Sequence, residues 1–472
     1  MTTEQTQTAF GPVLYFRRFD AGRVHLAALI GRAGIPGPLL AAGQKIAPRA
    51  LGQVGDMQLW RYDFTLGADD AGYAFEGRDY PVVTDLSGDM RIAFVSCNGE
   101  ENGDLDREAP ERNAMWDRLA DEHAANPFAL ILQGDDQIYA DEVTQSHVLS
   151  EDWPEFAPDT PSPAQLDDLR AHLRSRFAER YLMVLSADAY ARISAQVPSL
   201  SVWDDHDICD GWGSLADDLT NSAVGQVLFD VAREMYLLFQ HAAIEADIPD
   251  LFIDPHGANL GWVRQLPELT LIAPDLRSER TRRRIIGPAG WEGIDGLEPR
   301  PGQTFLISSV PLLGPRLSLV ERLMQVIPRM QHYEDDLRDQ WQSRAHRAEW
   351  RRMLRAVLRL RAAGPVTVVS GEIHVATRAE MLPKASLIHQ LVASGISHRA
   401  PPKAYGRALG LLAGLGEAPL KGFPIRNLRL PGQRARYVPQ RNYLMLNRKG
   451  GRWQAVWDLE ESGRTPALDL GE

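Results

Sequence analysis

Short strand-forming runs that end in metal-binding residue types are the feature that most constrains this chain. Four such runs occur, at Arg91–Val95, Phe128–Leu132, Ser199–Trp203 and Val366–Val369. Short and nearly continuous apolar runs are typical of strands in a sheet that is covered on both faces. In such α/β sheets, ligands bind outside the carboxyl ends of the strands. The runs therefore predict an α/β fold whose functional residues lie at one sheet edge.

The residues that follow these runs carry thiol, carboxylate, phenol and imidazole groups. They are, in chain order, Ser96-Cys97-Asn98-Gly99, Gly134-Asp135-Asp136-Gln137-Ile138-Tyr139-Ala140-Asp141, Asp204-Asp205-His206-Asp207 and Ser370-Gly371-Glu372-Ile373-His374. Four strands that deliver such side chains to one edge are the layout of a metal-dependent catalytic site.

Composition excludes some classes of function. The 472 residues include 51 Lys and Arg against 63 Asp and Glu, a formal charge of -12. Because phosphate-backbone contacts need a basic surface, we expect no nucleic-acid-binding surface. No run of about 18 apolar residues occurs, so we expect no membrane span. The first eight residues have neither a basic region nor an apolar stretch, which favours a cytoplasmic location.

The chain is expected to contain two domains. Residues 1–88 have short strand-like runs separated by Gly- and Pro-containing turns, which predicts a small antiparallel β-domain. From residue 89 onward strands alternate with helices, as in an α/β catalytic domain. The last part, 395–472, is expected to be an irregular wrap because its Gly395–Pro439 segment is rich in Gly and Pro. A terminal hairpin is expected within it, at Asn442–Leu446 and Arg452–Leu459. Helices are expected at Ala109–Ala125, Pro163–Val184, Asn221–Ala246 and Asp335–Ala363.

Two clusters suggest particular chemistry. A carboxylate and a phenolate at Asp136 and Tyr139 suit a hard trivalent ion such as Fe(III), although a capping Asp and a core Tyr would give the same pattern. The three carboxylates around His206 repel one another unless a cation neutralises them. A nearby carboxylate would also fix the tautomer of His206 and raise its pKa, which suits a general acid.

The remaining clusters are compatible with metal ligands as well. Glu372 and His374 are two residues apart at a strand end, so they point to the same side and can bind adjacent metal ions. Cys97 is either a buried small side chain or a thiolate ligand, and its strand-end position favours the ligand.

Taken together, the four clusters resemble those of the alkaline phosphatase D-like (PhoD-like) metallophosphoesterases, over roughly residues 90 to 400. Asp275-Leu276-Arg277-Ser278-Glu279-Arg280 and Ser308-Ser309-Val310-Pro311 are similar to further stretches of that family. The resemblance implies a four-layer αββα sandwich, often preceded by a small β-domain. It also implies a dinuclear metal centre, with Fe(III) and a divalent ion such as Ca, Mn, Zn or Fe.

The resemblance assigns roles to individual residues. The implied metal ligands are Cys97, Asp136, Tyr139, Asp205, Glu372 and His374, with Asp136 bridging the two ions. His206 would face the substrate as the catalytic residue. Asn98 and Arg277 are candidates for substrate contacts, although ion pairs that hold its loop are the favoured alternative for Arg277. Two departures are Glu372, where the family more often has Asp, and Asp135, where it often has Gly.

The expected reaction is hydrolysis of a small phosphate ester by in-line attack of a metal-bound hydroxide. A phosphodiester is the expected substrate, with monoesters and triesters as further possibilities. Two alternatives stay open: a dinuclear hydrolase of non-phosphate esters or amides, and a metal-binding protein without turnover. The sequence leaves the preferred ester, the second metal and the oligomeric state undetermined.

Overall fold

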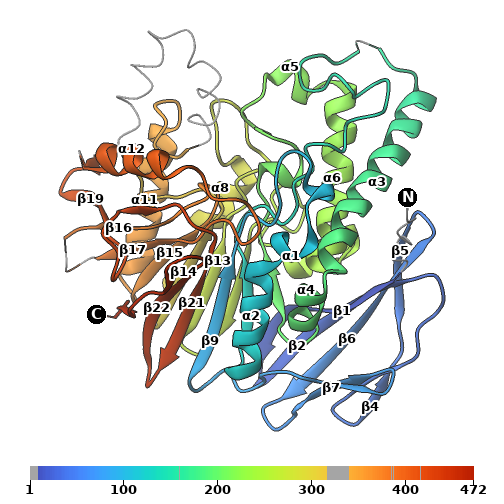
Figure 1. Ribbon diagram of the computed structural model, residues 1–472, viewed down its shortest axis with the longest axis horizontal. Coiled ribbons are helices and arrows are strands. Elements are labelled where there is room, and N and C mark those ends of the chain that lie inside the picture. Colours follow the sequence, from blue (N-terminus) through green and yellow to red (C-terminus); the bar gives the residue numbers. More distant parts are fainter. Residues whose placement is uncertain are drawn as a thin grey trace.

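The fold is mixed α/β and contains several sheets. A computed structural model describes residues 9–158, 160–315, 340–383, 385, 387–414 and 416–471. Within these residues, two large sheets and a small one form the framework (Figure 1).

The first sheet has 11 strands. Its strands, in spatial order, are β23 (Gly463–Arg464), β22 (Arg452–Leu459), β21 (Asn442–Lys449), β9 (Met90–Val95), β10 (Leu130–Gln133), β11 (Ser199–Ser201), β1 (Phe10–Asp20), β2 (Arg23–Arg32), β6 (Met57–Gly67) and β5 (Arg49–Val54), with β24 (Leu468–Asp469) beside β22. Strands β9, β10 and β11 are parallel neighbours. Their carboxyl ends therefore meet at one edge, with the first three ligand clusters.

The second sheet has nine strands. These are β12 (Trp262–Leu266), β13 (Leu269–Ala273), β14 (Gln303–Ser308), β15 (Val366–Ser370), β17 (Ile388–Val392), β16 (Ala376–Met381), β19 (Phe423–Leu428) and β18 (Glu417–Leu420), with β20 (Tyr437–Val438) beside β16. Strands β13, β14, β15 and β17 are parallel, so the fourth cluster also lies at a shared carboxyl edge.

A small sheet and the helices complete the fold. The small sheet contains β4 (Gln44–Ile46), β3 (Leu39–Ala41), β7 (Gly72–Phe75) and β8 (Arg78–Pro81). The described helices are α1 (Ala109–Arg112), α2 (Ala114–Ala125), α3 (Pro163–Leu185), α4 (Asp188–Ser194), α5 (Asp217–Thr220), α6 (Ala223–His241), α7 (Ile248–Leu251), α8 (Pro288–Asp295), α11 (Arg347–Arg361) and α12 (Lys403–Ala413), with short 3₁₀ turns η1 (Asp104–Asp106), η2 (Asp205–Asp207) and η3 (Glu245–Asp247).

Alternating residues of the second sheet divide between two hydrophobic cores. On β14, Phe305 and Ile307 join the core that contains the first sheet, whereas Leu306 joins the core under α8 and α11. The two large sheets also contact each other directly, because the Trp262 indole donates to the Ser201 carbonyl at 2.7 Å. Figure 1 accordingly shows α3 and α6 on one side of the paired sheets and α11 on the other.

The structure confirms the strand runs and corrects several helix boundaries. The expected helix 109–125 is divided at Asn113 into α1 and α2, and the helix expected from Asn221 to Ala246 is shorter. It ends because Ala242 adopts the left-handed conformation, with φ +44°, without a glycine to signal the end. Residues 335–339 of another expected helix lie outside the described residues, and 340–346 form turns before α11.

The C-terminal region is more regular than the sequence suggests. The prediction of an irregular segment is wrong for much of Gly395–Pro439, because α12 and the strands β18 to β20 lie there. The expected terminal hairpin is confirmed as β21 and β22. At the other end of the chain, β1 pairs with β11 of the first large sheet. The boundary predicted between residues 88 and 89 stays a prediction, and strand pairing continues across it. Among the described helices, none combines the length and the apolar character that crossing a membrane requires.

Candidate metal centre

Side chains from both large sheets converge where their parallel strands end. Three groups of residues each place one ligand atom per residue within 4.8 Å of the others: Cys97, Asp135 and Asp136; Asp136, Asp205 and His206; and Glu101, His374 and His398. A backbone bond from the Ile396 amide to the Ser96 carbonyl, 2.9 Å long, joins the loops after β17 and β9. The fold therefore brings residues nearly 300 positions apart to one site.

Cys97 lies fully buried among polar groups. Its Sγ is 3.2 Å from Asp135 Oδ2 and 3.0 Å from Ser394 Oγ. Burial, together with the charge of Asp136, raises the pKa of the Cys97 thiol to about 12. Since the thiolate is the form that binds metals, a cation must offset this effect if Cys97 is to be a ligand.

Asp135 and Asp136 form the centre of the site. Asp135 is 0% exposed and Asp136 1% exposed. Burial raises the pKa of both carboxyl groups. The charge of Cys97 adds to this at Asp135, and the charge of Asp135 adds to it at Asp136. No described residue donates a hydrogen bond to Asp136 Oδ1. Two adjacent buried carboxylates with an unpaired oxygen fit a metal ion, because buried charges need a partner.

Tyr139 connects this centre to the second sheet. Its hydroxyl is 3.0 Å from His374 Nε2, and its ring centroid is 4.5 Å from that of His206. Burial raises the pKa of the Tyr139 hydroxyl well above its usual value, and the charge of Cys97 adds to this. The phenol is thus close to the other ligand types, and as a phenolate it too would need a cation.

His206 is held by a carboxylate, as the sequence suggests, and that carboxylate is Asp141. The two Asp141 oxygens lie 2.9 and 3.0 Å from His206 Nδ1. Nδ1 therefore carries the hydrogen and donates it, which leaves Nε2 as the other functional atom. Burial alone lowers the pKa of His206, but the charges of Asp141, Asp205 and Asp136 outweigh it and hold the pKa well above the usual value.

The other carboxylates of this cluster have protein partners. Asp204 Oδ1 accepts hydrogen bonds from Arg277 Nε and from Ser309 Oγ. Asp207 accepts from the backbone amides of Gln137 and Ile138, both at 3.2 Å. The cation beside Asp204 is thus the guanidinium of Arg277. Burial raises the pKa of Asp207 to about 8, although backbone amides donate to it.

Asp205 differs because it also faces the metal-binding groups. Its Oδ2 accepts from the Gly211 amide at 3.0 Å and its Oδ1 from Arg277 Nη2 at 3.1 Å. Arg277 is fully buried and bonds to both Asp204 and Asp205, which is the geometry expected of ion pairs that hold the loop. Its proposed contact with substrate stays a prediction.

Two further predicted residues, Asn98 and Glu372, contact residues outside the three groups. Asn98 Oδ1 accepts from Trp116 Nε1 and Ser397 Oγ, both at 2.8 Å, so protein groups engage the amide oxygen. The Glu372 carboxylate accepts from Gln340 Nε2 at 2.6 and 2.8 Å and belongs to none of the three groups. The substrate role of Asn98 and the ligand role of Glu372 stay predictions.

Sequence reasoning left Asp135, Glu101 and His398 without roles. Asp135 stands inside a quoted cluster, and Glu101 follows Cys97 by four residues. His398 comes six residues after β17, so a fifth strand run, Ile388–Val392, followed by polar residues was the signal that could have found it.

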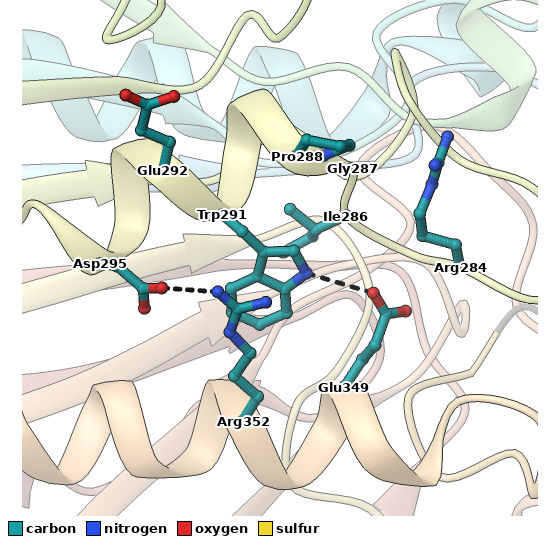
Figure 2. Close-up of a pocket in the computed structure, with 9 residues that line it drawn as sticks. All are labelled: Arg284, Ile286, Gly287, Pro288, Trp291, Glu292, Asp295, Glu349 and Arg352. Carbon is teal, nitrogen blue, oxygen red and sulfur yellow. Dashed lines mark hydrogen bonds and ion pairs between the residues drawn. The ribbon is translucent and has the colours of Figure 1, made fainter.

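A separate cavity lies between α8 and α11. It has a volume of about 500 Å³ and shares no lining residue with the three groups. Figure 2 shows two interactions among the side chains that line it. Arg352 lies 4.0 Å over the Trp291 ring and pairs with Asp295, while the Trp291 indole donates to Glu349. These contacts pack α8 against α11, and this packing forms the walls of the cavity.

Comparisons with known proteins find similarity in sequence and in fold. A family model described as PhoD related phosphatase matches residues 107–333. An uncharacterized protein of Saccharomyces cerevisiae, YGR266W, is 22% identical to this chain over a match that covers 68% of the chain. The chain spans 56% of the length of that relative. A solved structure titled "Structure of PhoD" superposes with a TM-score of 0.57 at 12% identity, over 98% of this chain and 90% of that one. The predicted resemblance to the PhoD-like family is confirmed, and the solved structure bears on the fold alone.

Proposed function

We propose, from the likeness of this chain to the PhoD related phosphatases, that it is a metal-dependent hydrolase of phosphate esters. The proposed substrate is a small phosphodiester, with monoesters and triesters as further candidates. The observation that carries the proposal is Asp136: it is buried, belongs to two ligand groups and has an oxygen without a hydrogen-bond donor. This is what a carboxylate that bridges two cations requires.

The donor set favours two different ions that share Asp136. Cys97 and Tyr139, with Asp136, would hold iron as Fe(III), while Asp205 and Glu372 would hold a divalent ion. His374 is also proposed as a ligand, and its neighbours in the structure are Glu101 and His398. A pair of metal ions supplies activation of a water and neutralisation of phosphoryl oxygens.

The contribution of the protein itself centres on His206. Asp141 fixes the ring by accepting from Nδ1, so the opposite atom, Nε2, is available to donate to a phosphoryl or leaving oxygen. Arg277 orients the acidic residues because it bonds to Asp204 and Asp205 at once. This arrangement holds a proton at a defined atom beside the proposed metal pair.

The finer description of the fold belongs to the same proposal. Helices lie on the outer faces of two sheets that contact each other, which we interpret as a four-layer αββα sandwich. Such a sandwich would place the loops after β9, β10, β11 and β15 around one pocket for the ester.

The two alternative functions can be separated by one experiment. Metal content and turnover of mono-, di- and triester chromogenic substrates should be measured on the same purified sample, together with an amide and a lactone. We expect bound iron and turnover of phosphate esters. Turnover of only the amide or lactone would favour a different dinuclear hydrolase. Bound metal without any turnover would favour a metal-binding protein.

Tyr139→Phe should remove a visible absorption band. A phenolate bound to Fe(III) absorbs by charge transfer, and phenylalanine cannot form that bond. The measurement is an absorption spectrum of the iron-loaded protein. Tyr443→Phe is the matched control, because Tyr443 is buried and its hydroxyl bonds to Asp458 instead. A band that survives Tyr139→Phe would exclude Tyr139 as a ligand, and an active protein without iron would exclude the Fe(III) proposal.

A further inference from the structure

Glu101 and His398 form an ion pair beside the proposed metal centre. Glu101 follows β9 and His398 follows β17, so the pair joins two loops at the edge where the strands end. The His398 ring stacks on the ring of His374, with centroids 3.4 Å apart and an interplanar angle of 15°. A Glu101 oxygen lies within 4.8 Å of a ring nitrogen of His374. The Glu101 carboxylate therefore occupies a position next to a proposed metal ligand.

His398 donates hydrogen bonds from both of its ring nitrogens. Its Nδ1 lies 2.7 Å from the Arg399 carbonyl oxygen, and its Nε2 lies 3.1 Å from both Glu101 oxygens. A carbonyl and a carboxylate accept hydrogen bonds and do not donate them, so each ring nitrogen carries a hydrogen. Nε2 thus donates to an anion that presents two oxygens at the same distance.

The position of His398 does not depend on Glu101. The His398 amide donates to the Cys97 carbonyl at 3.1 Å, and Arg107 Nη2 donates to the Ser397 carbonyl at 2.9 Å. The Arg107 side chain is 3% exposed, whereas the Glu101 side chain is 38% exposed. An ion pair with so exposed a carboxylate adds little stability, so holding the two loops together does not explain it. Glu101 is the partner that another anion can replace.

An anionic phosphate ester has the acceptors that Glu101 presents to His398. Monoesters and diesters carry negative charge and at least two free oxygens, as a carboxylate does, whereas a triester is uncharged and has one. The position also lies near the proposed donor His206. The centroid of the Tyr139 ring is 4.5 Å from that of His206 and 5.5 Å from that of His398. The two histidines therefore border the same part of the site.

We propose that His398 binds the phosphoryl group of an anionic phosphate ester through Nε2, at the position that Glu101 occupies in the free protein. Glu101 is then an internal anion that leaves Nε2 when the substrate binds. The proposal rests on the proposed function and narrows its substrates to mono- and diesters, because only these present two free oxygens to Nε2.

The first test compares charged and uncharged esters on the full, metal-loaded chain. His398→Phe keeps a ring over His374 and removes both donors. It should raise KM for a monoester and a diester about 10- to 100-fold, the usual effect of losing a hydrogen bond to a charged group. A triester should keep its KM or, where it is not turned over, its inhibition constant, and elemental analysis should show unchanged metal content. Equal changes for all three esters, an unchanged KM for the charged esters, or lost metal would overturn the proposal.

The second test measures binding of inorganic phosphate by calorimetry. His398→Phe should weaken binding about 10- to 100-fold, and His398→Gln, whose amide can donate near the place of Nε2, should recover part of the affinity. Glu101→Gln should tighten binding by up to about fivefold, the size of an exposed ion pair, because it removes the competing anion. The matched controls, His256→Phe and Glu108→Gln, change exposed residues outside the site and should bind phosphate as the unaltered protein does. Weaker binding by Glu101→Gln would overturn the exchange of anions.

Phosphate binding also separates this inference from the proposed function. If the protein hydrolyses no phosphate ester but His398→Phe still weakens phosphate binding, the inference about His398 stands and the proposed function fails. If esters are hydrolysed and His398→Phe binds phosphate as tightly as the unaltered protein, the proposed function stands and the inference fails.

Discussion

Asp136→Ala should abolish both turnover and stable metal loading at the Asp136 ions. A carboxylate that bridges two ions serves both, so neither of the two ligand groups that contain Asp136 would be complete without it. The metal-free variant should unfold at the same or a higher temperature than the metal-free unaltered protein. The reason is that Asp135 and Asp136 repel each other in a buried site, and the change removes that repulsion.

The measurements for Asp136 are elemental analysis, ester turnover and thermal unfolding on the same preparation. Asp136→Asn is the shape-conserving companion, and Asp121→Ala, a change at an exposed carboxylate of α2, is the control. The control should keep its metals and its rate. A purified Asp136→Ala protein with full metal content and rate would show that Asp136 does not bridge. A variant with lost metal and a collapsed unfolding temperature would show that Asp136 stabilises the fold instead.

The strand-end clusters could be predicted from sequence because their information is local. Each ligand type stands within a few residues of an apolar run, and parallel strands bring those ends together by geometry alone. Cys97, Asp136 and Asp205 are found in such groups. His398 shows the limit of this reasoning, because its neighbours Glu101 and His374 come from other strands and the strand before it, Ile388–Val392, contains polar residues and is a weaker signal than the four apolar runs.

The function of the charged residues around the site was harder to predict for a different reason. Composition cannot show which carboxylate a given arginine neutralises, and Arg277 turns out to bond to Asp204 and Asp205. The sequence likewise could not choose Asp141 over the nearer Asp205 and Asp207 as the partner of His206. Such choices depend on where loops far apart in the chain meet.

The C-terminal region was predicted to be irregular because glycine can either break a helix or allow close packing within one. Gly406 and Gly410 lie inside α12, and a sequence reading takes glycines there as helix breakers. A Cβ at Gly406 would lie 3.2 Å from the Pro439 ring, so at this position the glycine allows close packing. Helix α12 and the strands around it are therefore stabilised by contacts that their own sequence does not reveal.

His206→Asn should keep the metals while turnover falls by about 10²–10⁴-fold, the usual worth of a general acid. The expectation follows from the geometry, because Asp141 holds Nδ1 and leaves Nε2 to act on the substrate. Turnover and metal content should be measured together on esters with leaving groups of different acidity. If His206 protonates the leaving oxygen, the loss should shrink for good leaving groups. If it stabilises only phosphoryl oxygens, the loss should be similar for all esters.

Two companion variants make the result for His206 decisive. Asp141→Asn keeps the ring but removes the carboxylate charge, so a smaller loss of rate with full metal content is expected. His256→Asn changes an exposed histidine outside the site and should have no effect. His206 also belongs to one ligand group with Asp136 and Asp205, so a variant that loses metal together with activity would make it a ligand. An unchanged rate would remove it from the mechanism. If His206 is a proton donor, the variant keeps its metals and its rate falls.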